Sequence, residues 1–135
     1  MPIEFTVSDV IPASPQEIYD AWLSSEGHAE ITGGQPAEAS PEEGAVHKAW
    51  DGYINGTNLK LEPGKRIVQS WRTAEFARGN PDSQIEVLLE AVPGGTKVTL
   101  HHTNVPDGQP NYQEGWQTHY FEPMKAHFGR AKKKI

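Results

Sequence analysis

The sequence predicts an α+β domain, in which an antiparallel sheet packs against a long C-terminal helix. Strand-like alternation and tight turns fill residues 45–103, while helical patterns precede and follow this region. No strand–helix–strand repetition is present, so a parallel sheet is not expected. A chain of 135 residues suits one domain, which we place at residues 1–135.

The N-terminal pattern predicts one strand followed by two short helices. Residues 3–11 alternate apolar and polar side chains, as expected for a strand with one buried face. Ser14 then begins the motif SPQE, in which proline occupies the first helical position and Glu17 completes a capping box. Ser24 or Ser25 can cap a second short helix, which should end near the Gly-Gly pair that follows.

Five segments in the middle of the chain alternate like strands and are separated by turn sequences. Between the first two, Asp51 and Gly52 indicate a type I′ hairpin turn, because both central positions of that turn need positive φ. Gly56 predicts a β-bulge in the second segment. The expected strands cover residues 45–50, 53–62, 65–76, 84–92 and 96–103.

The last predicted element is a helix over roughly residues 112–130, capped by Asn111. Every fourth position in it is large and apolar or aromatic, and such a stripe is expected to face the sheet. Pro123 lies within this helix and removes one backbone hydrogen bond, so we expect a kink there. The stripe comprises Tyr112, Trp116, Tyr120, Met124 and Phe128.

Composition narrows the classes of function. The formal net charge is −6, which argues against binding to nucleic acid or to an anionic membrane. No apolar run approaches the roughly 20 residues of a membrane-spanning helix, and the N-terminal pattern is not that of a signal peptide. A cytoplasmic location is therefore the default expectation.

The residues that could perform chemistry form no recognisable catalytic or metal-binding motif. The absence of cysteine excludes thiolate catalysis and zinc–cysteine sites. His101 and His102 are adjacent and must point to opposite faces of their strand, and neither HExxH nor GxSxG occurs. We therefore predict no metal site, no cofactor and no catalytic residue. His102 shares a face with apolar residues, where it could orient a ligand or be a hydrogen-bonded buried group.

Three stretches, in this order and spacing, carry a resemblance to a known family: DGYINGTNLKLEPGKRIVQSWR (51–72), GGTKVTLHHTNVP (94–106) and EGWQTHYFEPMKAHF (114–128). They resemble the family of activators of heat-shock protein 90 ATPase homologues, within the START-like or SRPBCC superfamily. The resemblance covers nearly the whole chain. It implies a helix-grip fold, in which a curved antiparallel sheet wraps around a long C-terminal helix and two short helices follow the first strand. It also implies a cavity between the sheet and that helix.

The resemblance is to the C-terminal module of the eukaryotic co-chaperone that gives the family its name. That co-chaperone has a separate N-terminal domain that is important for engaging the chaperone. A chaperone of the heat-shock protein 90 type is thus an alternative partner, but activation of its ATPase does not follow from the resemblance alone.

The function that these observations favour is non-catalytic binding of a small hydrophobic or aromatic ligand between the C-terminal helix and the sheet. One alternative is an interaction module that regulates a chaperone ATPase. Another is an enzyme that works inside the cavity, such as a cyclase or a hydrolase.

The four tryptophans fall on four different elements, which is typical of an aromatic lining and equally of an ordinary aromatic core. Three polar side chains, His102, Tyr120 and Gln69, could orient the ligand. The expected ligand-binding residues are Trp22, Trp50, Leu61, Gln69, Trp71, Leu100, His102, Trp116, Tyr120 and Met124.

Overall fold

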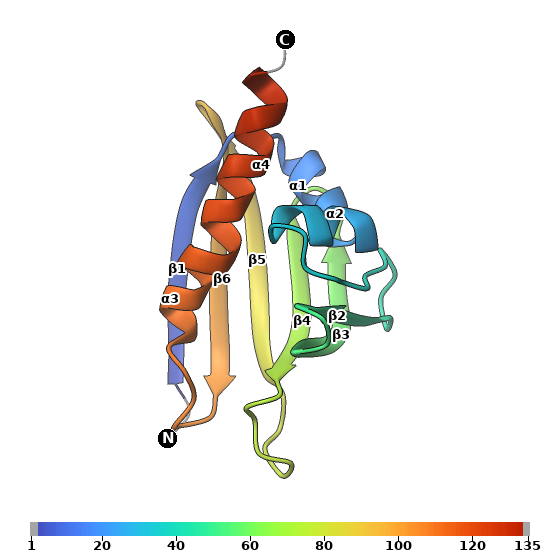
Figure 1. The fold of residues 1–135 in the computed structure, drawn as a ribbon, viewed down its shortest axis with the longest axis vertical. Helices are drawn as coiled ribbons and strands as arrows, with labels where there is room; N and C mark the ends of the chain where they lie inside the picture. Colours follow the sequence, from blue (N-terminus) through green and yellow to red (C-terminus); the bar gives the residue numbers. More distant parts are fainter. Residues whose placement is uncertain (1–2, 134–135) are drawn as a thin grey trace.

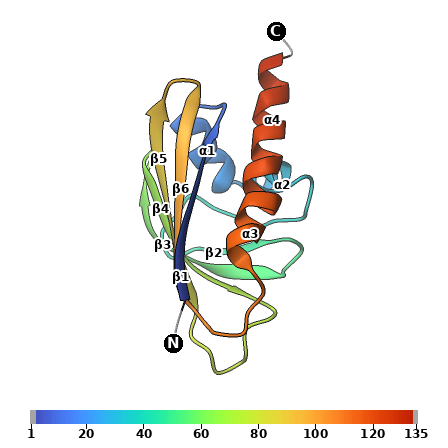
Figure 2. The ribbon, with the colours of Figure 1, turned by 90° about the vertical axis from the view of Figure 1, so that its left-hand side faces the viewer.

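The computed structural model describes residues 3–133, with side chains up to residue 129. It contains a six-stranded antiparallel sheet that curves around a long C-terminal helix (Figures 1 and 2). This arrangement confirms the predicted α+β helix-grip fold. The spatial order of the strands is β1-β6-β5-β4-β3-β2, so β1 and β2 form the two edges. The strands are β1 (Ile3–Ile11), β2 (Val46–Ala49), β3 (Ile54–Glu62), β4 (Arg66–Thr73), β5 (Ser83–Val92) and β6 (Gly95–Val105).

Two short helices, α1 (Pro15–Trp22) and α2 (Ser25–Ile31), follow β1 as predicted. The capping box at the start of α1 is present: the Glu17 amide donates to Ser14 Oγ over 3.1 Å, and the Ser14 amide donates to the Glu17 carboxylate over 2.9 Å. Ser24 caps α2 by accepting the Gly27 amide over 2.9 Å. Both helices lie on the same face of the sheet as the C-terminal helix (Figure 1).

The β5–β6 hairpin lies between β1 and β4 in the sheet and closes through the turn residues Pro93 and Gly94. Its inner face carries apolar side chains from both strands, as the alternation predicts. His102 lies on this inner face and is fully buried, whereas His101 points to the other side of the strand. The inward pairs are Ile85 with His102, Val87 with Leu100, and Leu89 with Val98.

The turn between β2 and β3 differs from the prediction. Residues 50–53 form a four-residue loop, and three successive residues in it have positive φ: Trp50 at 54°, Asp51 at 56° and Gly52 at 89°. Trp50 therefore leaves the strand that was predicted to contain it. Compared with the predicted two-residue turn, the loop contains two more residues, Trp50 and Tyr53. Their aromatic side chains lie toward the C-terminal helix, and local turn preferences do not encode such a contact between distant parts of the chain.

The prediction of a β-bulge at Gly56 is wrong. The register of β3 and β4 shifts between Asn58 and Lys60, two residues further along. Gly56 instead allows a close approach, since a Cβ there would lie 1.8 Å from the carbonyl oxygen of Ser70. The ring of His47 crosses the same place, and its Nε2 lies 3.0 Å from that carbonyl oxygen. A side chain at position 56 would displace this contact.

The C-terminal helix runs through α3 (Tyr112–Trp116), a π-helical turn η1 (Gln117–Phe121) and α4 (Glu122–Lys133). Its side-chain stripe faces the sheet, as predicted. Figures 1 and 2 show one continuous helix, so the disturbance expected as a kink at Pro123 takes the form of the π turn. The wider turn lies directly before Pro123 and leaves room for its ring, which would crowd a carbonyl of a regular α-helix. Because a π turn contains more residues than an α turn, the stripe of every fourth residue also drifts less around the helix axis.

The hydrophobic core fills the space between the sheet, the two short helices and the C-terminal helix. Trp22 of α1 and Phe121 of the π turn are among its largest fully buried side chains. Over the part of the chain that the structure describes, none of the helices is long and apolar enough to cross a membrane.

Candidate functional site

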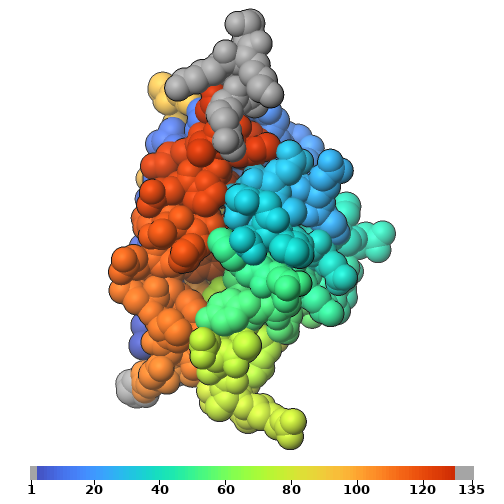
Figure 3. Space-filling model, in the orientation of Figure 1, coloured from blue at the N-terminus to red at the C-terminus, as the bar shows by residue number. Residues whose placement is uncertain are grey.

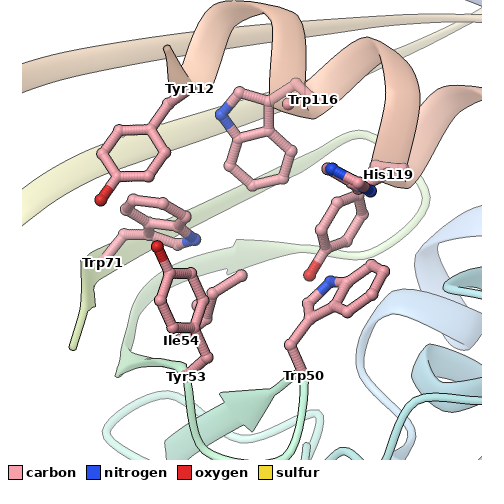
Figure 4. Close-up of a pocket in the computed structure, with 9 residues that line it drawn as sticks. Trp50, Tyr53, Ile54, Trp71, Tyr112, Trp116 and His119 are labelled. Atoms are coloured by element: carbon pink, nitrogen blue, oxygen red, sulfur yellow. The ribbon is translucent and has the colours of Figure 1, made fainter. Parts of the chain in front are cut away.

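A pocket of about 280 Å³ lies between the C-terminal helix and the β2–β3 loop. Figure 3 shows a recess at this place, between the orange surface of the helix and the green surface of β2 and β3. The pocket is therefore open to solvent along one side of the sheet. Nine residues line it (Figure 4): Trp50, Tyr53, Ile54, Trp71, Tyr112, Gly115, Trp116, His119 and Tyr120.

One wall is a face of the C-terminal helix. Tyr112, Trp116 and Tyr120 follow one another at intervals of four residues, which places them above each other on that face. Gly115 and His119 form a second, parallel row. Gly115 leaves space where any other residue would carry a side chain, since a Cβ there would meet only the His119 ring, at 3.9 Å. This missing side chain helps to keep the pocket open.

The opposite wall comes from the sheet and from the β2–β3 loop. Ile54 and Trp71 lie on β3 and β4, and Trp50 and Tyr53 lie in the loop. The Trp50 ring meets the His119 ring edge-on, with 5.4 Å between ring centroids, and so joins the two walls at the rim. Trp50 reaches this position with φ at 54°, a left-handed conformation that is unusual for a bulky side chain and often marks a functional site.

Tyr120 connects the pocket to a buried histidine. His28 Nδ1 lies 2.9 Å from the Trp22 carbonyl oxygen, so this nitrogen carries the proton. His28 Nε2 is then the acceptor for the Tyr120 hydroxyl, at 2.8 Å. Burial lowers the pKa of His28 to about 4 and raises the pKa of Tyr120, so both groups are neutral near pH 7. The hydroxyl proton of Tyr120 is thus directed away from the pocket.

His102 is held in one tautomer by its neighbours. Trp116 Nε1 donates to His102 Nδ1 over 3.1 Å, so the proton of His102 sits on Nε2, which lies 2.8 Å from Ser83 Oγ. Ser83 in turn donates to the Trp71 carbonyl over 2.7 Å. Burial lowers the pKa of His102 to about 3. His102 lies behind Trp116 and does not line the pocket.

Gln69 belongs to a second buried network. Its Oε1 accepts the Trp22 indole N–H over 3.1 Å, and its Nε2 donates to Asn58 Oδ1 over 2.8 Å. The Asn58 amide group then donates to the carbonyls of Ser40 and Glu42. These contacts pin the long connection between α2 and β2 to the sheet, so Gln69 is fully engaged inside the protein.

Trp71 differs from the buried Trp22 and Trp116 in the hydrogen bonding of its indole N–H. Its side chain is 3% exposed, yet its indole N–H has no hydrogen-bond partner among the described residues. Every fully enclosed polar atom of a described side chain has a partner, so this N–H must border open space. Figure 4 shows the indole nitrogen of Trp71 directed into the pocket. The pocket therefore offers one buried donor.

The pocket is lined without permanently charged side chains. No Asp, Glu, Lys or Arg is among its lining residues. Arg72, next to Trp71 in the sequence, is held by Asp82 at 2.8 Å and by two loop carbonyls. Among the described residues, no group of three or more His, Asp or Glu side chains is placed to hold a metal ion.

The structure brings four of the ten expected ligand-binding residues to the pocket. The central region behind this pocket is filled, because Trp22 stacks on Trp116 with 6.2 Å between ring centroids. Leu100 and Met124 are fully buried, and Leu61 lies at the far end of β3. The residues at the pocket are Trp50, Trp71, Trp116 and Tyr120, and those outside its lining are Trp22, Leu61, Gln69, Leu100, His102 and Met124.

Sequence reasoning missed five lining residues. Gly115 and His119 carried a usable signal, since each lies three positions after an aromatic residue of the stripe and therefore next to it on the helix face. Tyr112 was recognised as part of the stripe but was not assigned to the site. Tyr53 and Ile54 reach the pocket through the conformation of the β2–β3 loop, which the sequence did not reveal.

A curved antiparallel sheet that holds a long C-terminal helix is the START-like, helix-grip fold. Within this fold class, the chain belongs to the family described as "Activator of Hsp90 ATPase homolog 1-like protein". The model of that family matches residues 12–129.

Curated relatives carry the same family name. The human "Activator of 90 kDa heat shock protein ATPase homolog 1" is 27% identical over 127 residues, which is 93% of this chain and 37% of the human protein. The homologue from Dictyostelium discoideum is 29% identical over 123 residues, or 89% of this chain and 31% of that protein. The chain thus spans about a third of the length of these relatives.

Solved structures share the fold. An HSP90 activator from Plasmodium falciparum superposes with a TM-score of 0.83 at 18% identity, over 94% of this chain and 96% of that one. A protein from Chromobacterium violaceum gives a TM-score of 0.73 at 24% identity, over 91% and 94% of the two chains. At these identities the similarity concerns the fold alone.

Proposed function

We propose that the protein binds a small hydrophobic or aromatic molecule in the pocket between the C-terminal helix and the β2–β3 loop, without transforming it. The observation that carries this proposal is an uncharged pocket of about 280 Å³ whose walls are mostly aromatic. Such a volume lies near the lower end of the range of ligand pockets, roughly 300–1,000 Å³, and so suits a compact ligand.

Burial of apolar ligand surface would supply most of the affinity. At about 25 cal/mol per Å², a ligand that buries roughly 200 Å² gains about 5 kcal/mol from this term. Stacking on Trp116 and on the tyrosines adds about 0.5–1.5 kcal/mol for each well-placed ring pair. Together these contributions are sufficient for micromolar binding only if the walls change little when the ligand enters.

Filling the pocket should abolish binding without unfolding the protein. In Gly115→Leu, the new side chain would occupy the pocket, and it should meet no backbone because the Cβ position is open. We expect the affinity for tetralin, a small bicyclic hydrocarbon, to fall by about tenfold or more. Titration followed by the indole N–H signals in ¹H–¹⁵N NMR spectra measures this change.

The matched control is Gly129→Leu, at another helical glycine with open space around it but outside the pocket. Both substitutions favour the helix, by up to about 1 kcal/mol. If tetralin does not bind the wild-type protein, or binds Gly115→Leu and Gly129→Leu equally well, the proposed site is wrong. Native mass spectrometry of protein purified from its host would then begin to identify the natural ligand.

Regulation of a heat-shock protein 90 type chaperone is a second candidate function, supported by the names of the relatives. Because the chain spans about a third of those proteins, their activity is only a proposal here. The test is the ATP hydrolysis rate of the host's heat-shock protein 90 homologue with and without the protein. An unchanged rate at saturating concentration would exclude direct regulation of the ATPase.

A further inference from the structure

We propose that the pocket selects neutral aromatic molecules that carry a hydrogen-bond acceptor such as a carbonyl oxygen, and that Trp71 Nε1 donates to this acceptor. The inference rests on the proposed function and adds the chemical class of the ligand. It begins from the buried indole N–H of Trp71, which has no partner among the described residues and faces the pocket (Figure 4).

An unpaired buried donor makes the free energy of binding depend on whether the ligand offers an acceptor. A hydrocarbon placed against the Trp71 N–H would separate it from water without replacing the lost hydrogen bond, at a penalty of about 1–3 kcal/mol. A ligand with an oxygen or nitrogen acceptor at that point avoids the penalty. The pocket can therefore discriminate between two ligands of the same shape that differ only in an acceptor.

The tyrosine hydroxyls on the walls are already engaged within the protein. The Tyr112 hydroxyl donates to Gln109 Oε1 over 2.8 Å and lies 2.6 Å from Thr73 Oγ1. The Tyr120 hydroxyl donates to His28 Nε2. The Tyr53 hydroxyl donates to Glu75 Oε2 over 3.4 Å, and the Trp50 side chain is hydrogen-bonded to Tyr120. Each of these donors can turn toward a ligand only if an internal hydrogen bond breaks, so the Trp71 N–H is the donor that a deeply bound ligand meets without such a loss.

The charge of the pocket favours a neutral ligand. None of its lining residues is acidic or permanently basic, and the nearby Arg72 is held on the other side by Asp82. A carboxylate inside the pocket would lose hydration without gaining an ion pair, which disfavours anionic ligands. An aromatic ring system fits the flat walls presented by Trp116 and Tyr112.

The test compares two probes with the same ring skeleton, tetralin and its ketone α-tetralone. One neutral hydrogen bond contributes about 0.5–1.5 kcal/mol, so α-tetralone is expected to bind about two- to tenfold more tightly than tetralin. In NMR spectra, the indole N–H signal of Trp71 should move downfield with α-tetralone and not with tetralin. The anion naphthoate should bind more weakly than either probe.

The control variant is Trp71→Phe, which keeps an aromatic ring at the position and removes the N–H. We expect the preference for α-tetralone over tetralin to disappear in this variant. The readout is the ratio of the two affinities within the variant, which cancels any loss of wall contact common to both probes. A second variant, Trp50→Phe, removes another indole N–H from the wall and should leave the preference intact. Far-ultraviolet circular dichroism establishes that each variant is folded.

The possible outcomes separate the inference from the proposed function. If both probes bind equally well and both are lost in Gly115→Leu, the pocket binds ligands but the acceptor inference is wrong. Preference for α-tetralone that survives in Trp71→Phe also overturns the inference. If neither probe binds the wild-type protein up to its solubility limit, the inference and the proposed site both fail.

Discussion

At the level of single residues, the buried tryptophans differ in what their indole N–H groups meet. Trp22 donates to Gln69 and Trp116 donates to His102, whereas the Trp71 N–H faces the pocket. All three side chains are at most 3% exposed. Burial alone therefore does not separate a structural tryptophan from one that is available to a ligand, but the hydrogen-bond partner does.

This difference should appear in the free energy of unfolding. Trp116→Phe leaves the buried Nδ1 of His102 without its donor, and the loss of a partner inside the protein costs about 1–3 kcal/mol. Trp71→Phe removes a similar volume of side chain but breaks no hydrogen bond. We therefore expect Trp71→Phe to be less destabilising than Trp116→Phe by about 1–3 kcal/mol in urea denaturation. Equal losses of stability would contradict the assignment of the two N–H groups.

At the level of elements, the β2–β3 loop shapes one side of the site. Trp50 and Asp51 adopt left-handed conformations that cost an L-residue about 1–2 kcal/mol each, and Gly52 adopts one without that penalty. Strain of this kind persists where surrounding contacts compensate for it. Here the contact of Trp50 with His119 on the C-terminal helix is one such contact.

The loop conformation can be tested through its glycine. Gly52→Ala places a Cβ at a φ of 89°, where it meets no neighbouring atom, so only backbone strain changes. We expect a loss of about 1 kcal/mol in the free energy of unfolding. The control is Gly79→Ala, in a loop position that is also open but lacks the left-handed φ, where the change should stay within about 0.5 kcal/mol. A neutral Gly52→Ala variant would show that the loop has another conformation in solution.

The elements also show where prediction from sequence succeeds. The capping box at Ser14, the strand alternation and the helical stripe are local patterns, and the structure has each of them. Gly56 was misread because its role depends on Ser70 and His47, which approach it from other strands. Trp22 was expected at the site, and it lies outside the pocket lining for a similar reason. Nothing in the sequence shows that Trp22 stacks on Trp116 and fills the centre.

At the level of the whole molecule, three histidines are buried in the core region: His28, His47 and His102. Burial lowers the pKa of each below the ordinary value of 6.5, to about 4 for His28 and to about 3 for His102. All three hold their hydrogen bonds in the neutral form, and a protonated His102 would direct a second N–H at the donor Trp116. Protonation of each of these three histidines is therefore less favourable in the folded protein than in the unfolded chain.

Acid should destabilise the fold before most carboxylates titrate. Because the folded pKa values lie below the unfolded value of 6.5, the unfolded chain takes up protons first, and stability is full above pH 6.5 and falls below it. Between pH 6 and pH 5 we expect a loss on the order of 1 kcal/mol per pH unit for His28 and a similar loss for His102. Urea denaturation at pH 7.5, 6 and 5 measures the slope.

Proton NMR spectra give an independent check on this expectation. The ring signals of His28 and His102 should not titrate between pH 7.5 and pH 5, while the unfolded chain titrates near 6.5. A flat stability profile over this range, or a ring signal of His28 or His102 that titrates near pH 6.5 in the folded protein, would contradict the buried, neutral assignment.

The arrangement of the tryptophans has a spectroscopic consequence. The chain has four of them, and their rings gather around one place: the Trp116 centroid is 5.5 Å from that of Trp71 and 6.2 Å from that of Trp22, and Trp50 lies on the same wall of the pocket as Trp71. Excitation energy absorbed by one indole can pass to its neighbours over such distances, so nearly all intrinsic fluorescence originates beside the pocket. The protein thus carries its own optical reporter, which a bound aromatic molecule would quench without any added label.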